Sequence, residues 1–175
     1  LCQRFGFLRC RLLNDLEATA YGLPALDDAD LLTLQAGAPE MLGNAAVIAA
    51  GTGLGEAGLY WDGQSYRPFA TEGGHATFSP RNTLEFALLR HLQQRHSEHM
   101  RGHVSWERVV SGMGLLDLYI FLLAYRHVST PAWLAEEMRS TDTAAAISAA
   151  ALANSDAVCL ETMHLFVSLY GAEAD

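Results

Sequence analysis

The spacing of hydrophobic and polar positions follows two different patterns along the chain, and the pattern changes once. From Leu8 to about Ser79, short apolar runs alternate with Gly, Pro and Asp turns, a pattern typical of strands. From Asn82 onward, apolar side chains recur every three or four residues, which indicates helices. The pattern therefore predicts an α+β or α/β chain in which strands come first and helices follow.

Two apolar runs have the length of strands, and a third segment has the signature of a hairpin. The runs cover Leu8 to Leu13 and Ala45 to Ala50. Farther on, the aromatic segments Leu59 to Trp61 and Gln64 to Phe69 flank Asp62-Gly63, a dipeptide favoured in tight turns. We expect both runs to be buried strands and the aromatic segments to form a β-hairpin.

The helical part has recognisable ends. Asn82 is a suitable N-cap for the first helix, and Ser155 for the last. Between them we expect a short helical turn at Trp106, an apolar helix over Leu115 to Tyr125, and a helix that begins at Pro131. The predicted buried faces consist of Leu84, Ala87, Leu88, Leu89 and Leu92 in the first helix, and Val158, Leu165, Phe166, Leu169 and Tyr170 in the last.

Composition excludes several kinds of chemistry. The chain has 175 residues and a net charge of −9, and its 11 basic residues are all arginine. Without lysine, neither a Schiff base nor a Walker-type phosphate loop can form. The acidic excess argues against nucleic acid or an anionic membrane as a partner. The length and the 50% apolar content suit one compact domain, or part of one.

Cysteine usage and apolar length bear on the compartment. Cys2, Cys10 and Cys159 are odd in number and lack metal-like spacing, which favours a reducing compartment and hence the cytoplasm. The longest apolar stretches, Leu115 to Tyr125 and Ala144 to Ala153, fall short of the ~20 residues that span a bilayer. We expect both to be core helices.

A glycine-rich segment follows the second apolar run. Gly51-Thr52-Gly53-Leu54-Gly55 would let the backbone approach a bulky anion such as a phosphate and present its N–H groups. Gly53 to Gly58 also matches the dinucleotide fingerprint, but that fingerprint requires a helix next, whereas a hairpin is expected here. A glycine-rich turn with no ligand is the third alternative.

Two polar segments are candidates for substrate contact. Asp15, after the first apolar run, is either a helix cap or a carboxylate placed to accept a proton from a substrate hydroxyl, with Asn14 beside it for a second hydroxyl. Glu72 and His75 are separated by two glycines, so both could line a small polyhydroxylated ligand; a polar loop is the alternative. Glu107, taken alone, indicates a helix-surface glutamate paired with an arginine.

Histidine spacing offers a further alternative. Four of the seven histidines lie close together, namely His91, His96, His99 and His103, and the last three have helical spacing. Two of them could hold zinc, but the surrounding residues are those of a solvated helix end, and we expect no metal site.

In their order and spacing, these segments resemble the bacterial glucokinases of the actin-like, RNase H-like ATPase fold. The matching segments are Leu13-Asn14-Asp15-Leu16-Glu17-Ala18, Ala50-Gly51-Thr52-Gly53-Leu54-Gly55, Glu72-Gly73-Gly74-His75, and His103-Val104-Ser105-Trp106-Glu107-Arg108-Val109 with Ser111-Gly112-Met113-Gly114-Leu115. The related repressor/open-frame/kinase sugar kinases carry a cysteine-rich zinc motif after the sugar loop. No cysteine lies between Cys10 and Cys159, which disfavours that branch.

The resemblance implies a function: ATP-dependent phosphorylation of glucose at its 6-hydroxyl, the first step of glucose use in glycolysis. It implies that Asp15 is the general base and that Mg²⁺ accompanies ATP. By the same resemblance, the sugar ligands are Asn14, Glu72, His75 and Glu107, and the residues nearest the ATP phosphates are Gly51, Thr52 and Gly53. It also implies a homodimer.

The chain also departs from the family pattern. It lacks the opening Asp-x-Gly-Gly-Thr phosphate hairpin and the closing glycine-rich adenosine segment, so we expect the middle of a two-lobed kinase. Residues 1–44 would end the small lobe, and residues 45–175 would begin the large lobe. A non-catalytic sugar-binding or interaction fragment is the alternative. The kinase interpretation requires Asp15, Glu72 and Glu107 to converge on one hexose-sized cleft.

Overall fold

The structure is a computed structural model that describes residues 2–38, 43–97 and 102–175. The chain divides into two compact units. The first consists of Leu1–Ala49 and Glu56–Thr71, and the second of Ala50–Gly55 and Glu72–Asp175. The second unit therefore contains the glycine-rich segment as well as the helices.

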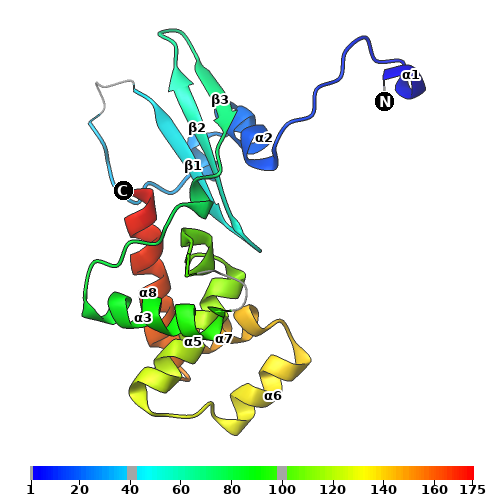
Figure 1. The fold of residues 1–175 in the computed structure, drawn as a ribbon. Coiled ribbons are helices and arrows are strands. Elements are labelled where there is room, and N and C mark those ends of the chain that lie inside the picture. The colour runs from blue at the N-terminus through cyan, green and yellow to red at the C-terminus, as the bar shows by residue number, and fades with distance from the viewer. Residues whose placement is uncertain (1, 39–42, 98–101) are drawn as a thin grey trace. The chain divides into compact units, whose positions relative to one another are not determined.

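The first unit is built on a three-stranded sheet (Figure 1). Its strands are β1 (Ala45–Ala50), β2 (Leu54–Trp61) and β3 (Tyr66–Ala70), hydrogen-bonded in the order β1-β2-β3. Helix α2 (Asp15–Gly22) packs on the sheet through Ala20, which is buried with Ala57 and Leu59. The short elements of this unit are α1 (Cys2–Phe5), η1 (Leu23–Ala25) and η2 (Asp28–Asp30).

The predicted hairpin is confirmed. Strands β2 and β3 are antiparallel, with Trp61 opposite Tyr66. In the turn, the Asp62 carboxylate accepts the backbone N–H groups of residues 64 and 65 at 2.9 and 2.8 Å and the Nε–H of Arg67 at 2.7 Å. These hydrogen bonds lower the pKa of Asp62 to about 2. Gly63 adopts a φ of +93°, a conformation that favours glycine.

The prediction of a strand over Leu8 to Leu13 is wrong. This run has no regular structure, and Leu8 and Leu12 are exposed. A strand exists only through hydrogen bonds to a neighbour, and no strand of the described residues pairs with this run. Strand β1 forms as predicted but is not buried: Val47, Ile48 and Ala50 are half-buried, and its other alanines are exposed. The sheet of the described chain covers one edge of β1 only, through β2.

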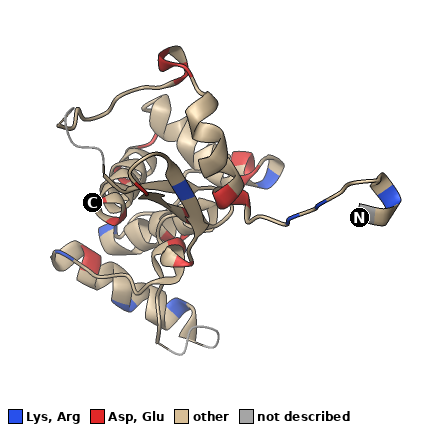
Figure 2. Ribbon diagram, turned by 90° about the horizontal axis from the view of Figure 1, so that it is seen from above, with Lys and Arg blue, Asp and Glu red and all other residues tan. Residues whose placement is uncertain are grey.

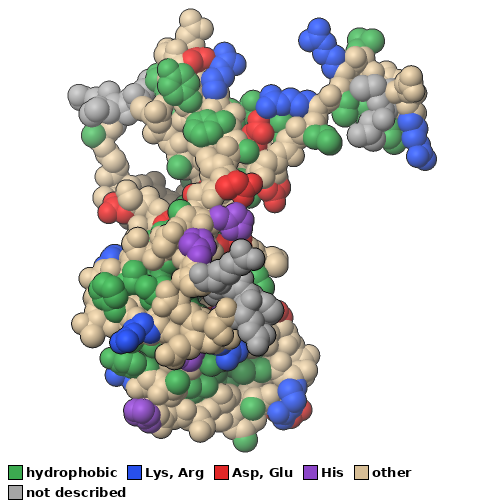
Figure 3. Space-filling model, in the orientation of Figure 1, with side chains coloured by type: hydrophobic (Ala, Val, Ile, Leu, Met, Phe, Trp, Pro, Cys, Tyr) green, Lys and Arg blue, Asp and Glu red, His purple; other side chains and the backbone are tan. Residues whose placement is uncertain are grey.

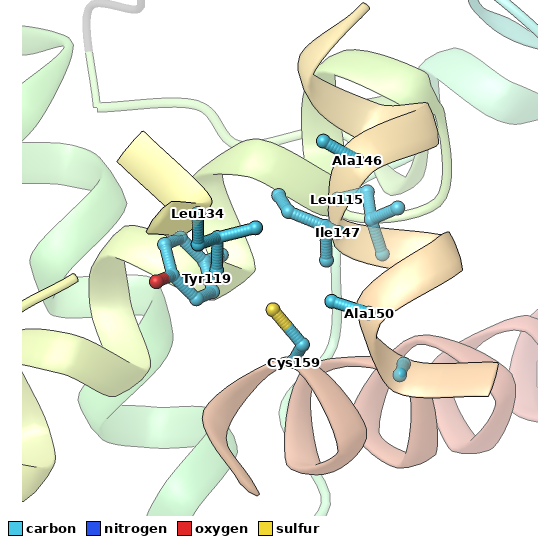
Figure 4. Packing of buried hydrophobic residues seen from close by; sticks show 8 residues of the cluster. Leu115, Tyr119, Leu134, Ala146, Ile147, Ala150 and Cys159 are labelled. Carbon is cyan, nitrogen blue, oxygen red and sulfur yellow. The ribbon is translucent and has the colours of Figure 1, made fainter. Parts of the chain in front are cut away.

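The second unit is mainly helical. Its helices are α3 (Thr83–Arg95), α5 (Gly112–Arg126), α6 (Ala132–Ser140), α7 (Thr143–Leu152) and α8 (Ala157–Ala174), with 3₁₀ turns η3 (Gly73–His75) and η4 (Trp106–Arg108). Side chains from α5, α6, α7 and α8 meet in one core (Figure 4). That core includes Tyr119, Leu134, Ile147 and Cys159. Burial raises the pKa of the Cys159 thiol to about 12, so the thiol remains protonated and inert at neutral pH.

Helix starts follow the sequence signals closely, with two corrections. Asn82 caps α3 as predicted, accepting the Glu85 N–H at 3.0 Å. The apolar helix begins at Gly112 rather than Leu115, because Ser111 caps it one turn earlier. Asp156, not Ser155, caps α8. The reason is that the Ser155 hydroxyl donates to a carbonyl at the end of α7, whereas the Asp156 carboxylate accepts the N–H of residue 159.

Acidic and basic residues both occur along the described ribbon (Figure 2), and on the face shown in Figure 3 hydrophobic side chains lie among charged ones. Within the described ranges, no single helix has both the length and the apolar character of a membrane span. Only α7 and α8 taken together, with a 102° bend between them, meet that criterion by length and composition.

The start of α3 provides a test of stability against pH. Glu85 is buried and accepts hydrogen bonds from the side chain and backbone of Arg81, the shortest at 2.7 Å. Burial alone would raise the pKa of Glu85, but the hydrogen bonds from Arg81 outweigh it, and the pKa is lowered. A lowered folded pKa stabilises the protein above the unfolded pKa, and this contribution is lost as pH falls through the folded pKa.

We therefore expect Glu85→Gln to lower the urea midpoint at pH 7 and to flatten its decline between about pH 5 and pH 3. The measurement is urea unfolding at a series of pH values. Glu136→Gln, an exposed glutamate on α6, is the matched control and should reproduce the wild-type curve. An acid limb of unchanged slope in Glu85→Gln would contradict the assignment.

Candidate functional site

The glycine-rich segment forms an exposed turn between β1 and β2. Within it, the Gly51 N–H donates to the Gly53 carbonyl at 2.8 Å. The Gly51 carbonyl in turn accepts the N–H of Gly112, the first residue of α5, at 2.9 Å. The turn is therefore tied to the start of α5, and the backbone at Gly51 and Thr52 remains open to solvent.

Glu107 lies directly against this turn. It belongs to η4, and its Oε2 accepts the N–H of Leu54 at 3.1 Å. A Cβ atom at Gly53 would overlap that carboxylate, so the close approach requires glycine. The side chain of Glu107 is 28% exposed. Among the described residues, Glu107 therefore contacts a backbone N–H and a histidine rather than the arginine that its sequence neighbourhood indicates.

The Glu72–His75 segment completes the cluster. Gly74 is buried, and a Cβ atom there would overlap the backbone carbonyl of Leu54. The histidine ring lies between two carboxylates: His75 Nδ1 is 3.8 Å from Glu107 Oε1, and His75 Nε2 is 3.6 Å from Glu72 Oε2. The structure thus brings together Glu72, His75 and Glu107 at the end of the glycine turn.

Backbone pairing holds the two segments of this cluster together. Thr77 pairs with Ser105 in an isolated β-bridge, and the Trp106 N–H donates to the carbonyl of residue 76 at 3.0 Å. Beneath the bridge, the Phe78 and Trp106 rings meet edge to face with centroids 5.0 Å apart. These contacts hold η3 and η4 side by side, which puts His75 near Glu107.

Asn14 and Asp15 lie in the first unit. Asn14 is the N-cap of α2, with its Oδ1 accepting the N–H groups of Leu16 at 2.9 Å and Glu17 at 3.3 Å. Asp15 is exposed and is the first residue of the helix, so the capping alternative applies to Asn14 instead. The convergence of Asp15 with Glu72 and Glu107 stays a prediction.

A cavity of about 450 Å³ borders the glycine turn. Its walls come from the turn and from the first turns of α5 and α7: Gly51, Thr52, Gly112, Met113, Leu116, Asp142, Thr143 and Ala144. The cavity therefore offers apolar side chains next to exposed loop backbone, a combination that suits a ligand with a flat apolar part and a charged part.

The structure decides against the dinucleotide alternative. Gly58 lies inside β2, which continues as a strand to Trp61, so the helix that a dinucleotide fingerprint requires is not there. The histidine alternative rests partly on His99, which lies outside the described residues. Of the others, His96 contacts a carboxylate and His91 packs edge-on against Phe121. No group of three metal-ligating side chains occurs in the described part of the chain.

The second unit also contains a buried ionic cluster that the sequence patterns did not predict. Asp117 of α5 is buried, and its carboxylate contacts Arg95, His96 and Arg108. The signal was available, since Asp117 is the one acidic residue within an otherwise apolar helical segment. A carboxylate on a buried face needs a cationic partner.

Solved structures define the class of protein. The chain superposes on a glucokinase from an Antarctic psychrotroph with a TM-score of 0.78 and 32% identity, covering 97% of this chain and 48% of that one. It superposes on the Balamuthia mandrillaris glucokinase, solved in complex with glucose, with a TM-score of 0.69 and 30% identity, covering 93% and 46%. The chain therefore has the predicted α/β fold of these sugar kinases, part of the two-lobed actin-like architecture.

Sequence comparison then identifies the family. A family model described as Glucokinase matches residues 1–175. The Nostoc punctiforme glucokinase is 40% identical over 99% of this chain and 53% of its own length, and the Synechocystis glucokinase is 40% identical over 99% and 52%. The chain belongs to the glucokinase family, as the resemblance predicted, and spans about half the length of the curated relatives it matches.

Proposed function

We propose that the protein carrying this chain transfers the γ-phosphoryl group of ATP to the 6-hydroxyl of glucose. In this step the O6–phosphorus bond forms, the bond from phosphorus to the ADP oxygen breaks, and the O6 proton passes to Asp15. The observation that carries the proposal is the cluster of Glu72, His75 and Glu107 at the end of the glycine turn. Family membership supports it.

The cluster of Glu72, His75 and Glu107 has the chemistry of a sugar site. Each carboxylate can accept two hydroxyl protons, and the His75 ring can donate one. The Glu72 side chain is 83% exposed, so it is free to turn toward a ligand. We propose that Glu72, His75 and Glu107, with Asn14 from the first unit, hold the hydroxyl groups that do not react. A sugar that lacks one of these hydroxyls would leave an acceptor unpaired, at a cost of about 1–3 kcal/mol.

The glycine turn suits the phosphates of ATP. Gly51 and Gly53 bring the backbone close without side chains, and the adjoining cavity of about 450 Å³ lies next to Gly51 and Thr52. Phosphoryl transfer depends on positioning and charge neutralisation, which backbone N–H groups can supply without lysine. Mg²⁺ is usually held through substrate phosphates and neutralises their charge, so this chain need not provide a metal cage.

Family membership also supports proposals about the lobes, the oligomeric state and the compartment. We propose that residues 1–44 end the small lobe and residues 45–175 begin the large lobe of a kinase that closes on its substrates. We also propose a cytoplasmic homodimer that takes glucose and Mg·ATP as its partners and begins glycolysis.

The test of the sugar site is Glu72→Gln in the complete enzyme. Because an amide keeps the shape but loses an acceptor, we expect glucose affinity to fall by about 5- to 100-fold. Folding should be unaffected, since Glu72 is exposed. Calorimetric titration with glucose measures the affinity. Glu136→Gln, exposed on α6, is the matched control. If both variants bind glucose like wild type, Glu72 is not a sugar ligand.

A further inference from the structure

Asp117 is the centre of a buried ionic cluster that joins three elements. Its Oδ2 lies 2.6 Å from Arg108 Nη2 of η4 and 3.0 Å from His96 Nε2. Its Oδ1 lies 3.2 Å from Arg95 Nε, at the end of α3. The side chain of Asp117 is 4% exposed and that of Arg108 is 23% exposed. Helix α5, the end of α3 and η4 are therefore held in one arrangement by a single carboxylate.

Arg108 directly follows Glu107, so whatever fixes Arg108 also fixes the turn that carries Glu107. This turn is a 3₁₀ helix of three residues, too short to determine its own orientation. It packs on the first turn of α5, where a Cβ atom at Gly114 would overlap the backbone of residues 108 and 109. The Arg108 side chain contacts Asp117 of α5, and the neighbouring Glu107 side chain contacts the N–H of Leu54.

Glu107 has two separate contacts, and each needs the same orientation of η4. One carboxylate oxygen, Oε2, accepts the N–H of Leu54 at the end of the glycine turn. The other, Oε1, lies 3.8 Å from Nδ1 of His75, in the cluster of Glu72, His75 and Glu107. A small rotation of η4 would break the first contact and misdirect the second. Buried ion pairs contribute little net stability compared with apolar packing, and geometric definition is their better-supported role.

We propose that Arg108 and Asp117 are positioning residues that aim Glu107, so that one carboxylate holds the glycine turn and the sugar site in register. Through Glu107, the pair would couple the geometry of the phosphate-binding turn to that of the glucose site. The expected effect on the glucose KM rests on the proposed function, whereas the expected effect on the hydrogen bond to the Leu54 N–H does not.

The test uses Arg108→Lys and Asp117→Asn in the complete enzyme. Lysine keeps the charge but not the planar guanidinium geometry. We expect the glucose KM to rise about tenfold or more in both variants, with kcat changed by less than about threefold. Hydrogen exchange followed by mass spectrometry should show faster exchange in the peptide that contains Leu54. A role confined to folding would lower the folded fraction without moving the KM of the enzyme that remains folded.

Arg126→Lys is the matched control, because Arg126 forms an exposed ion pair with Glu161 elsewhere in the same unit. It should leave the glucose KM and the exchange at Leu54 unchanged. If Arg108→Lys and Asp117→Asn match this control in both measurements, the inference is overturned. If wild-type enzyme does not phosphorylate glucose, the proposed function fails, and the exchange at Leu54 still decides the positioning role.

Discussion

Asp15→Asn should lower the turnover of the complete enzyme by about 10²- to 10⁴-fold, because an amide cannot accept the proton that leaves the sugar 6-hydroxyl. The substitution preserves shape, so glucose affinity should stay within a few-fold of wild type. Asp15 is exposed at the first position of α2, and its Oδ1 accepts the N–H of Leu16 at 2.9 Å, a bond that an amide oxygen can also accept. Glucose 6-phosphate formation measures turnover, and calorimetric titration measures affinity.

Two comparisons separate chemistry from structure in this variant. Asp15 lies in the first turn of α2, where a negative charge stabilises the helix by about 0.3–1 kcal/mol, so a small loss of stability is expected in Asp15→Asn. Asp28→Asn, another exposed aspartate of the first unit, is the control and should keep full turnover. Turnover that persists in Asp15→Asn would remove Asp15 from the role of base.

Features fixed by near neighbours along the chain could be predicted from the sequence. The Asp62 turn and the Asn82 cap depend on hydrogen bonds that span three to five residues, so their signals lie within one short window. The run from Leu8 to Leu13 has the composition of a strand, but a strand depends on a partner that no local pattern can supply. The prediction that β1 is buried was wrong for the same reason.

The sequence could predict only those residues of the candidate site that lie within a short motif. Glu72, His75 and the glycine turn stand out from the residues themselves, Glu107 was added through the resemblance, and the structure brings them together. The Arg108–Asp117 pair was not predicted, because Arg108 belongs to η4 and Asp117 to α5, a separate helix that begins at Gly112 after its cap Ser111. The sequence pattern indicates only that Glu107 pairs with an arginine. Which of two acidic residues an arginine contacts is decided by tertiary packing.

Ile147→Ala should cost about 2–5 kcal/mol of unfolding free energy, the largest stability effect that we predict for the helical unit. Ile147 is fully buried in the core formed by α5, α6, α7 and α8 (Figure 4). Alanine would remove three side-chain carbons and leave a cavity, because the surrounding helices can relax only partly. Urea unfolding followed by circular dichroism measures the loss.

Leu152→Ala on the same helix is the matched control. Leu152 is 86% exposed, so its truncation should change stability by no more than about 0.5 kcal/mol. The first turn of α7 supplies Asp142 and Thr143 to the cavity beside the glycine turn, so loosening this core should also weaken Mg·ATP binding. An Ile147→Ala variant as stable as Leu152→Ala would mean that the packing of α7 on α5 and α8 does not support the nucleotide side of the site.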